Sequence, residues 1–211
     1  MKSKRVLVET VLVAAISLGG MLFLAQAKTI FALLPVAYLL IEARLRHRSW
    51  SDLGFKFGTL WQDLRTNWLW FVLAAFVSQT VTVLWARAFF PAYVEHVQAR
   101  LPFNQGMSWA ILLPVLAISI LGEELTYRTL FQGRLSPYIS VPAAVLTASV
   151  LFGLAHFSPG PAAIVATDLG LIFVDSILYG VIYARGNNVI LSWAAHLLGD
   201  ILALALMVAL L

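Results

Sequence analysis

The sequence predicts an all-α protein: a polytopic bundle of transmembrane helices with a polar site inside the membrane. Of its 211 residues, 61% are hydrophobic and only 11% are charged, whereas a typical soluble domain is about 25% charged. A membrane helix needs roughly 20 apolar residues, so this length allows about seven spans. One membrane domain over residues 1–211 is the simplest organisation.

The predicted spans are apolar runs separated by polar or turn-forming segments. The second run is short and either tilts or extends into Arg44. The runs are Val6 to Gln26, Thr29 to Ile41, Trp68 to Phe90, Trp109 to about Arg134, Val141 to Phe157, Ala162 to Tyr183 and Val189 to Leu211. The connecting segments are 42–67, 91–107, 136–140, 158–161 and 184–188.

The first run has two interpretations. A basic start, an apolar stretch and the small residues Ala25 and Ala27 are typical of a cleavable signal peptide. However, the stretch is longer than the usual 7–15 residues and Glu9 interrupts it. We therefore expect a retained span, and cleavage would leave the later segments intact.

The charge pattern predicts the orientation. With a cytoplasmic amino terminus, all but three of the 14 lysines and arginines lie in cytoplasmic segments, as the positive-inside rule requires. The exceptions are Lys28, Arg87 and Arg100. The carboxyl terminus then lies on the outer side of what we expect to be a bacterial-type cell membrane. Nucleic acid is not an expected partner, because the cations lie beside apolar ends rather than in aromatic-rich patches.

The segment Arg44 to Gly58 mixes cations with Trp50 and Phe57. Such a stretch lies in the lipid interface with its arginines toward anionic headgroups, or it forms a solvated loop. The sequence does not decide between these two. Membrane lipid is a predicted partner in either case, and the absence of cysteine excludes a thiolate metal site or a cysteine nucleophile.

Acids and histidines interrupt the last runs. Glu123 and Glu124 stand near the end of one run, His156 near the end of the next, and His196 and Asp200 within the last. An ionised group at the centre of a membrane helix costs roughly 2.5–3.5 kcal/mol even on the lenient insertion scale, so such residues indicate function. Helical rise from the predicted turns places these groups within a layer of about 11 Å.

Spacing within each helix predicts which groups act together. Residues four apart share a helix face, whereas neighbours diverge. Glu124 and Arg128 are therefore predicted to form an ion pair, which turns Glu123 toward a different face. His196 and Asp200 share a face, and so do Phe152 and His156; Phe152 is expected to serve packing. Peptide hydrolysis requires a general base beside a water molecule and hydrogen-bond donors for the developing oxyanion.

Three motifs in order carry a family resemblance: Glu123-Glu124-x-x-x-Arg128, Phe152-x-x-x-His156 and His196-x-x-x-Asp200. They resemble those of the CAAX protease and bacteriocin-processing (CPBP, or Abi) family, the glutamate-type intramembrane endopeptidases that include the Ras-converting CAAX enzyme. The resemblance covers residues 109–211, predicted to be the catalytic helices. The RSWSDLG stretch resembles a further family element more loosely.

The resemblance implies roles for these residues. Glu123 and His156 would activate water, His196 and Asp200 would form the oxyanion hole, and Glu124 and Arg128 would support the first motif. The best-known members have asparagine at the last position. Because an ionised aspartate repels an oxyanion, Asp200 must be protonated, paired with His196 or used differently. The resemblance implies no cofactor, and it implies a membrane-associated protein or peptide substrate, with or without a lipid anchor, cut near its carboxyl end.

Other classes of protein fit parts of the pattern. A zinc-dependent intramembrane protease would use Glu123, His156, His196 and Asp200 as ligands, although no HExxH helix is present. Intramembrane acids and histidines also serve proton pathways, but inverted repeats typical of transporters are missing. A non-proteolytic membrane protein that confers immunity or regulates a partner is a third alternative. The sequence does not predict the oligomeric state.

Overall fold

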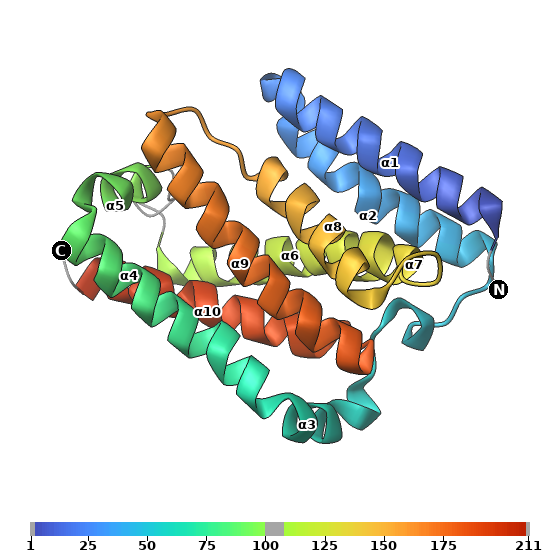
Figure 1. Ribbon diagram of the computed structural model, residues 1–211. Helices are drawn as coiled ribbons and strands as arrows, with labels where there is room; N and C mark the ends of the chain where they lie inside the picture. Colours follow the sequence, from blue (N-terminus) through green and yellow to red (C-terminus); the bar gives the residue numbers. More distant parts are fainter. Residues whose placement is uncertain (1–2, 100–107, 210–211) are drawn as a thin grey trace.

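The computed structural model describes residues 3–99 and 108–209, and within them every regular element is a helix (Figure 1). Two π-helical segments, Leu73–Val77 and Leu125–Gln132, continue the helices before them without a break. Three short 3-10 turns are Ala25–Ala27, Ser51–Leu53 and Phe57–Thr59. The α-helices are α1 (Lys4–Phe23), α2 (Lys28–Leu45), α3 (Leu60–Val72), α4 (Ser78–Phe89), α5 (Pro91–Gln98), α6 (Trp109–Glu124), α7 (Gly133–Leu135), α8 (Val141–Ala155), α9 (Ala162–Gly186) and α10 (Val189–Ala209). The all-α prediction is confirmed.

Length and composition make this chain an integral membrane protein. In the described part of the chain, 5 helical stretches are long and apolar enough to cross a membrane: Lys4–Phe23, Phe57–Phe89, Trp109–Leu135, Ala162–Gly186 and Val189–Ala209. The apolar helix α8 is shorter. α2 is not among the 5, and it carries Lys28, Glu42 and Arg44. The predicted count of about seven spans is therefore not confirmed.

Two predicted connecting segments contain more helix than expected. α2 continues to Leu45 and α3 begins at Leu60. Both ends of the predicted connecting segment 42–67 are therefore helical. The first part of α3 was not predicted as helix because its polar residues interrupt the apolar pattern. Within the predicted segment 91–107, Pro91 opens α5, because proline fits the first turn of a helix. Residues 100–107 lie outside the described part of the chain.

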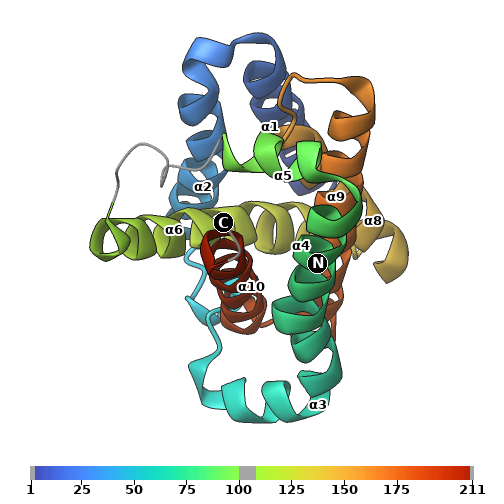
Figure 2. The same ribbon diagram turned by 90° about the vertical axis from the view of Figure 1, so that its left-hand side faces the viewer.

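The helices pack as pairs around two that cross. α1 lies along α2, and α8 lies along α9 (Figure 1). The first pair is close because Gly20 faces the Phe31 ring, where a Cβ would come within 2.1 Å. α6 and α10 cross between the α1–α2 pair and α3, and Figure 2 shows α6 from the side with α10 nearly end-on. Side chains at this crossing therefore lie inside the bundle.

The start of α10 is fixed by the segment after α2. The Asn188 side chain accepts a hydrogen bond from the Ile190 amide at 3.1 Å, and the Val189 amide donates to the Gly54 carbonyl at 2.9 Å. Both bonds satisfy amides that a helix leaves unpaired in its first turn. Gly54 has φ of 92°, and a Cβ there would lie 3.2 Å from the Val189 nitrogen. The RSWSDLG stretch thus anchors the helix that carries His196.

The cations of that stretch do not all face outward. Arg46 and Arg48 both contact Glu42, at 2.8 Å and 3.5 Å. Trp50 and Phe57 are exposed. The structure thus pairs two arginines of this stretch with Glu42 and leaves two of its aromatic rings exposed.

Candidate active site

α6 ends on two adjacent glutamates that point to different sides of the helix. The Glu124 side chain is fully buried, and its Oε2 lies 3.4 Å from Nε of Arg128. The Glu123 side chain is 29% exposed and lines a cavity. Neighbouring residues on a helix diverge by about 100°, so one glutamate can pair inside the protein while the other faces the cavity.

Arg128 lies in the π-helical segment Leu125–Gln132, which begins directly after Glu124. All the residues of that segment are buried. The Arg128 guanidinium donates to Ser176 Oγ at 3.0 Å and lies 5.6 Å from the centre of the Phe152 ring. π-Helical turns inside α-helices are frequent at functional sites, and this one holds the cation that neutralises Glu124.

His196 is held by the buried glutamate and presents its other nitrogen to two further acids. Its Nδ1 lies 3.0 Å from Glu124 Oε1. Because an ionised carboxylate only accepts, Nδ1 must carry the hydrogen. Nε2 is then 3.9 Å from Glu123 Oε2 and 3.9 Å from Asp200 Oδ1. The imidazole therefore stands between the first and third motifs.

His156 follows the last turn of α8. Its Nδ1 is 2.8 Å from the Phe152 carbonyl oxygen, and since a carbonyl only accepts, Nδ1 is the donor. Nε2 is left to face the cavity. The Phe152 ring lies 4.3 Å from the His156 ring and 5.8 Å from the His196 ring, centre to centre. Phe152 thus spaces the two imidazoles, which agrees with its predicted packing role.

One cavity of about 180 Å³, here the central cavity, is lined by all four predicted catalytic residues, Glu123, His156, His196 and Asp200. These side chains come from α6, the end of α8 and α10. A cavity needs only about 10–15 Å³ of probe-occupied volume to hold a water, provided that polar groups face it. The central cavity is therefore large enough to hold water.

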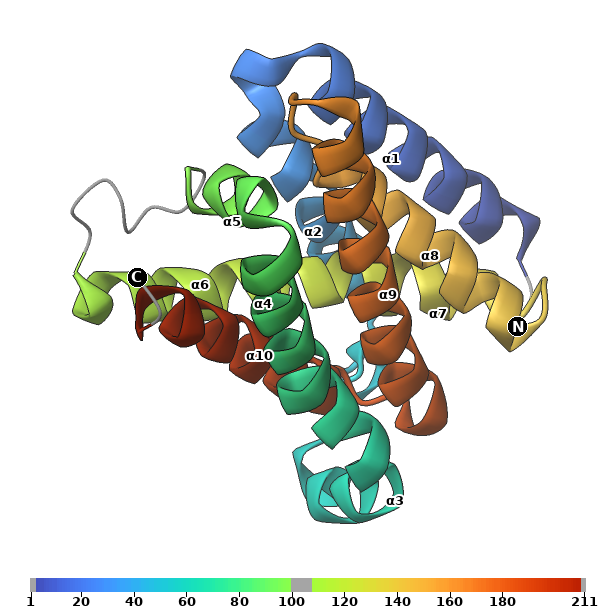
Figure 3. The ribbon, with the colours of Figure 1, turned by 60° about the vertical axis from the view of Figure 1, so that its left-hand side comes forward.

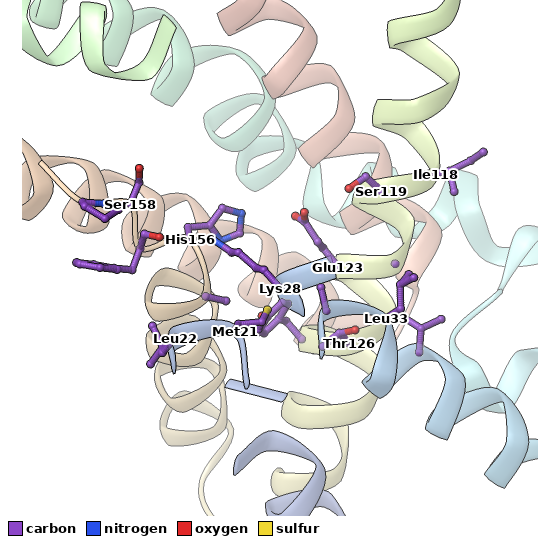
Figure 4. A pocket seen from close by; sticks show the side chains of 17 residues that line it. Met21, Leu22, Lys28, Leu33, Ile118, Ser119, Glu123, Thr126, His156 and Ser158 are labelled. Carbon is purple, nitrogen blue, oxygen red and sulfur yellow. Dashed lines mark hydrogen bonds between the residues drawn. The ribbon is translucent and has the colours of Figure 1, made fainter. Parts of the chain in front are cut away.

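Two larger pockets adjoin the central cavity. The first, the lysine pocket, has a volume of about 600 Å³, is bounded by α1, α2, α6 and α8, and contains Lys28. The second, the aspartate pocket, has a volume of about 310 Å³, is bounded by α4, α5, α9 and α10, and contains Asp168, Asp175 and Asp200. In Figure 4 the Glu123 carboxylate and the His156 ring face each other across the lysine pocket. His156 lines all three spaces.

Comparison with known protein families gives a match to the segment that contains the four predicted catalytic residues. Residues 105–202 match a family model described as type II CAAX prenyl endopeptidase Rce1-like. Over these residues the chain is similar to the Rce1-like family. The match contains all three motifs and agrees with the resemblance seen in the sequence. No curated protein and no solved structure matched the chain. Similarity to this family indicates a hydrolase, and specifically a protease of the membrane.

Sequence reasoning missed the second contact of Glu124. The four-residue spacing predicts its pairing with Arg128, but not its hydrogen bond to His196. That bond depends on how α6 and α10 cross, a crossing also fixed by the Trp193 side chain, which donates to the Ala117 carbonyl at 2.9 Å. An acid and a histidine at similar predicted depth on two different spans are the sequence signal that would have suggested this bond.

Tyr179 and Asp175 also line the central cavity. The Tyr179 ring stacks on His196 with centres 4.3 Å apart. Asp175 accepts hydrogen bonds from Ser78 and Gln79, where α4 approaches α9 (Figure 3). The spacing of Asp168 and Asp175 predicts a shared face, and both line the aspartate pocket. These residues belong to α9, which carries none of the three motifs.

A metal ion in a protein needs several ligands grouped in space. Among residues 3–99 and 108–209, no three His, Asp or Glu side chains are grouped so that they could hold one.

Proposed function

We propose that this protein is an intramembrane endopeptidase that hydrolyses a peptide bond in a membrane-associated protein or peptide through water activated by Glu123. The observation that carries the proposal is the central cavity, where Glu123, His156, His196 and Asp200 meet inside an apolar bundle. The family match supports a protease, and the geometry supports the assignment of roles.

Glu123 is the proposed general base. Its side chain is 29% exposed, whereas that of Glu124 is fully buried and bonded to His196. Glu123 can therefore take a proton from a water molecule while the new hydroxide attacks the carbonyl carbon. His156, with Nε2 toward the same space, orients the water or shares its proton. The proton then passes to the leaving amine as the carbon–nitrogen bond breaks.

His196 and Asp200 are the proposed stabilisers of the oxyanion. Preorganised donors aimed at a developing negative charge typically supply 10²–10³ in rate. Since Nδ1 of His196 already donates to Glu124, a hydrogen bond from Nε2 requires the imidazolium form. Asp200 Oδ1 lies 3.9 Å from Nε2, so pairing with His196 is the role that this geometry favours for Asp200.

The test is a comparison of membranes from cells that carry the wild type or Glu123→Gln. Quantitative proteomics should find at least one cleavage product that disappears in the variant. Glu95→Gln, a change of an exposed glutamate on α5, is the matched control and should leave the product in place. An immunity or regulatory protein would keep its phenotype in the Glu123→Gln strain, and that result would overturn the proposal.

The substrate class follows from the membrane location and the family. We expect a CAAX-type or peptide-maturation cleavage, with a prenylated substrate only where prenylation occurs. The alternative of a zinc protease is tested in parallel: purified enzyme treated with a chelator should keep its activity, whereas loss reversed specifically by zinc would favour the metal mechanism.

The orientation is also a proposal, with the amino terminus in the cytoplasm and the carboxyl terminus outside. The start of α1 and the end of α10 lie at opposite ends of the bundle (Figure 1). Arg46, Arg48 and Arg134 gather near the start of α1, while Lys28 lies at the other end of the α1–α2 pair. This separation supports the orientation selected by the positive-inside rule.

A further inference from the structure

The two pockets beside the central cavity differ in charge. Of the described residues that line the lysine pocket, Lys28 is the one lysine or arginine and Glu123 the one acid. The aspartate pocket contains Asp168, Asp175 and Asp200 and no lysine or arginine among its described lining residues. Both pockets are otherwise largely apolar and both reach His156. A substrate that passes through the central cavity therefore meets Lys28 on one side and three aspartates on the other.

Lys28 projects into the lysine pocket rather than away from it. Its side chain extends toward His156 in Figure 4, and its Nζ lies 3.4 Å from the Phe157 carbonyl oxygen. An ammonium group has three donors, so this single long bond leaves donors for a ligand.

Resting on the proposed function, we infer that Lys28 binds a carboxylate of the substrate and so determines its direction and specificity. A free carboxyl terminus a short distance beyond the scissile bond is attracted to Lys28. The same carboxylate is repelled from the aspartate pocket, whose described lining residues include three aspartates and no lysine or arginine. The carboxyl-terminal side of the cleaved bond then occupies the lysine pocket, and the amino-terminal side occupies the aspartate pocket. Lys28 is thus a specificity-determining residue for peptides cut near a free carboxyl end.

The experiment uses purified full-length protein in detergent micelles and pairs of synthetic acyl-anchored peptides. The members of each pair are identical except for a carboxylate or a carboxamide at the carboxyl end, and mixed sequences are used because no single substrate is known. Mass spectrometry locates the cleavage sites, and kcat/KM is measured for each pair that is cut. The wild type should prefer the carboxylate by roughly tenfold or more, the size expected for a charged hydrogen bond.

Variants at Lys28 separate recognition from packing. Lys28→Met should bring the ratio of carboxylate to carboxamide kcat/KM close to one, mainly through KM, because the contact is remote from the reacting bond. Lys28→Arg should keep the preference, and Lys28→Glu should reverse it. Lys4→Met, at an exposed lysine at the start of α1, is the matched control and should leave the ratio at its wild-type value.

Two results would overturn the inference while the proteolytic function stands: equal cleavage of both members of each pair by the wild type, or an equal loss on both members in Lys28→Met. Absence of cleavage of every peptide by the wild type would instead count against the proposed function itself. The inference and the function on which it rests are therefore distinguishable in one set of assays.

Discussion

Two groups of charged side chains lie in this bundle, and they are built differently. The end network consists of Glu9, Glu42, Arg46 and Arg134, near the start of α1. Arg46 lies 2.6 Å from Glu9 and 2.8 Å from Glu42, and Arg134 lies 2.5 Å from Glu42. Each acid there has at least two arginine partners. The charges of the end network therefore cancel one another and join α1, α2 and α7.

The central cluster consists of Glu123, His156, His196 and Asp200. Its acids lie 3.9 Å from the His196 Nε2, beyond hydrogen-bond range, and a cavity opens between them. Close pairing stabilises a fold but leaves no room for a reactant, whereas spacing around a cavity leaves groups available to water. The comparison predicts that substitutions in the end network affect stability first and those in the central cluster affect activity first.

Glu124 pairs with the buried Arg128 and also holds His196 of the central cluster. Its loss should have the largest effect on stability. Glu124→Ala leaves Arg128, which is fully buried, without its acidic partner. Removing one member of a buried ion pair costs about 3–5 kcal/mol. His196 also loses the acceptor that orients it, so cleavage should fall as well. The measurements are the thermal midpoint in detergent and the cleavage rate per folded molecule; an unchanged midpoint would contradict the role given to Glu124.

Tyr179 tests whether packing alone supports the central cluster. Tyr179→Leu removes the ring that stacks on His196 at 4.3 Å but leaves every charged group in place. Aromatic pairs contribute about 0.5–1.5 kcal/mol beyond their buried area, so a modest loss in cleavage is expected with a smaller change in midpoint. Tyr179→Phe is the control and should behave like the wild type. A Leu variant as active as the wild type would mean that Glu124 alone orients His196.

Arg5 gives the smallest expected effect. Its Nε lies 2.8 Å from Glu9 Oε1, but its side chain is 82% exposed. Exposed pairs four residues apart on a helix contribute only about 0.3–0.5 kcal/mol. Arg5→Ala should therefore shift the thermal midpoint slightly and leave cleavage intact. A large loss of stability would contradict this account, because it would show that Glu9 depends on its exposed partner Arg5 more than on Arg46.

Much of the central cluster could be predicted from the sequence because helical spacing is regular. The divergence of Glu123 from Glu124 and the pairing of Glu124 with Arg128 follow from it, and the last three motif-bearing runs are helices as predicted. The number of spans could not be predicted in the same way, because α2 carries charges and α8 is short. Contacts between helices were also beyond reach: the bond from His196 to Glu124 depends on the crossing of α6 and α10.

The role of the segment from Arg44 to Gly58 could not be predicted from the sequence either. Its composition suggests lipid contact or a loop, whereas the structure shows that Gly54 anchors α10 through Val189. A backbone hydrogen bond across more than a hundred residues leaves no periodic signal in a sequence. The positive φ of Gly54 and its close approach to Val189 explain the glycine, and both are properties of the fold.

The most direct test compares Glu123→Gln with Glu42→Gln, two identical changes in the two groups. Purified wild type and both variants are assayed for peptide cleavage per folded molecule and for thermal midpoint in the same detergent. Loss of a general base should lower cleavage by about 10²–10⁴ with little change in midpoint for Glu123→Gln. Glu42→Gln should lower the midpoint and keep cleavage per folded molecule. Full cleavage by Glu123→Gln would contradict the claim that this carboxylate activates water.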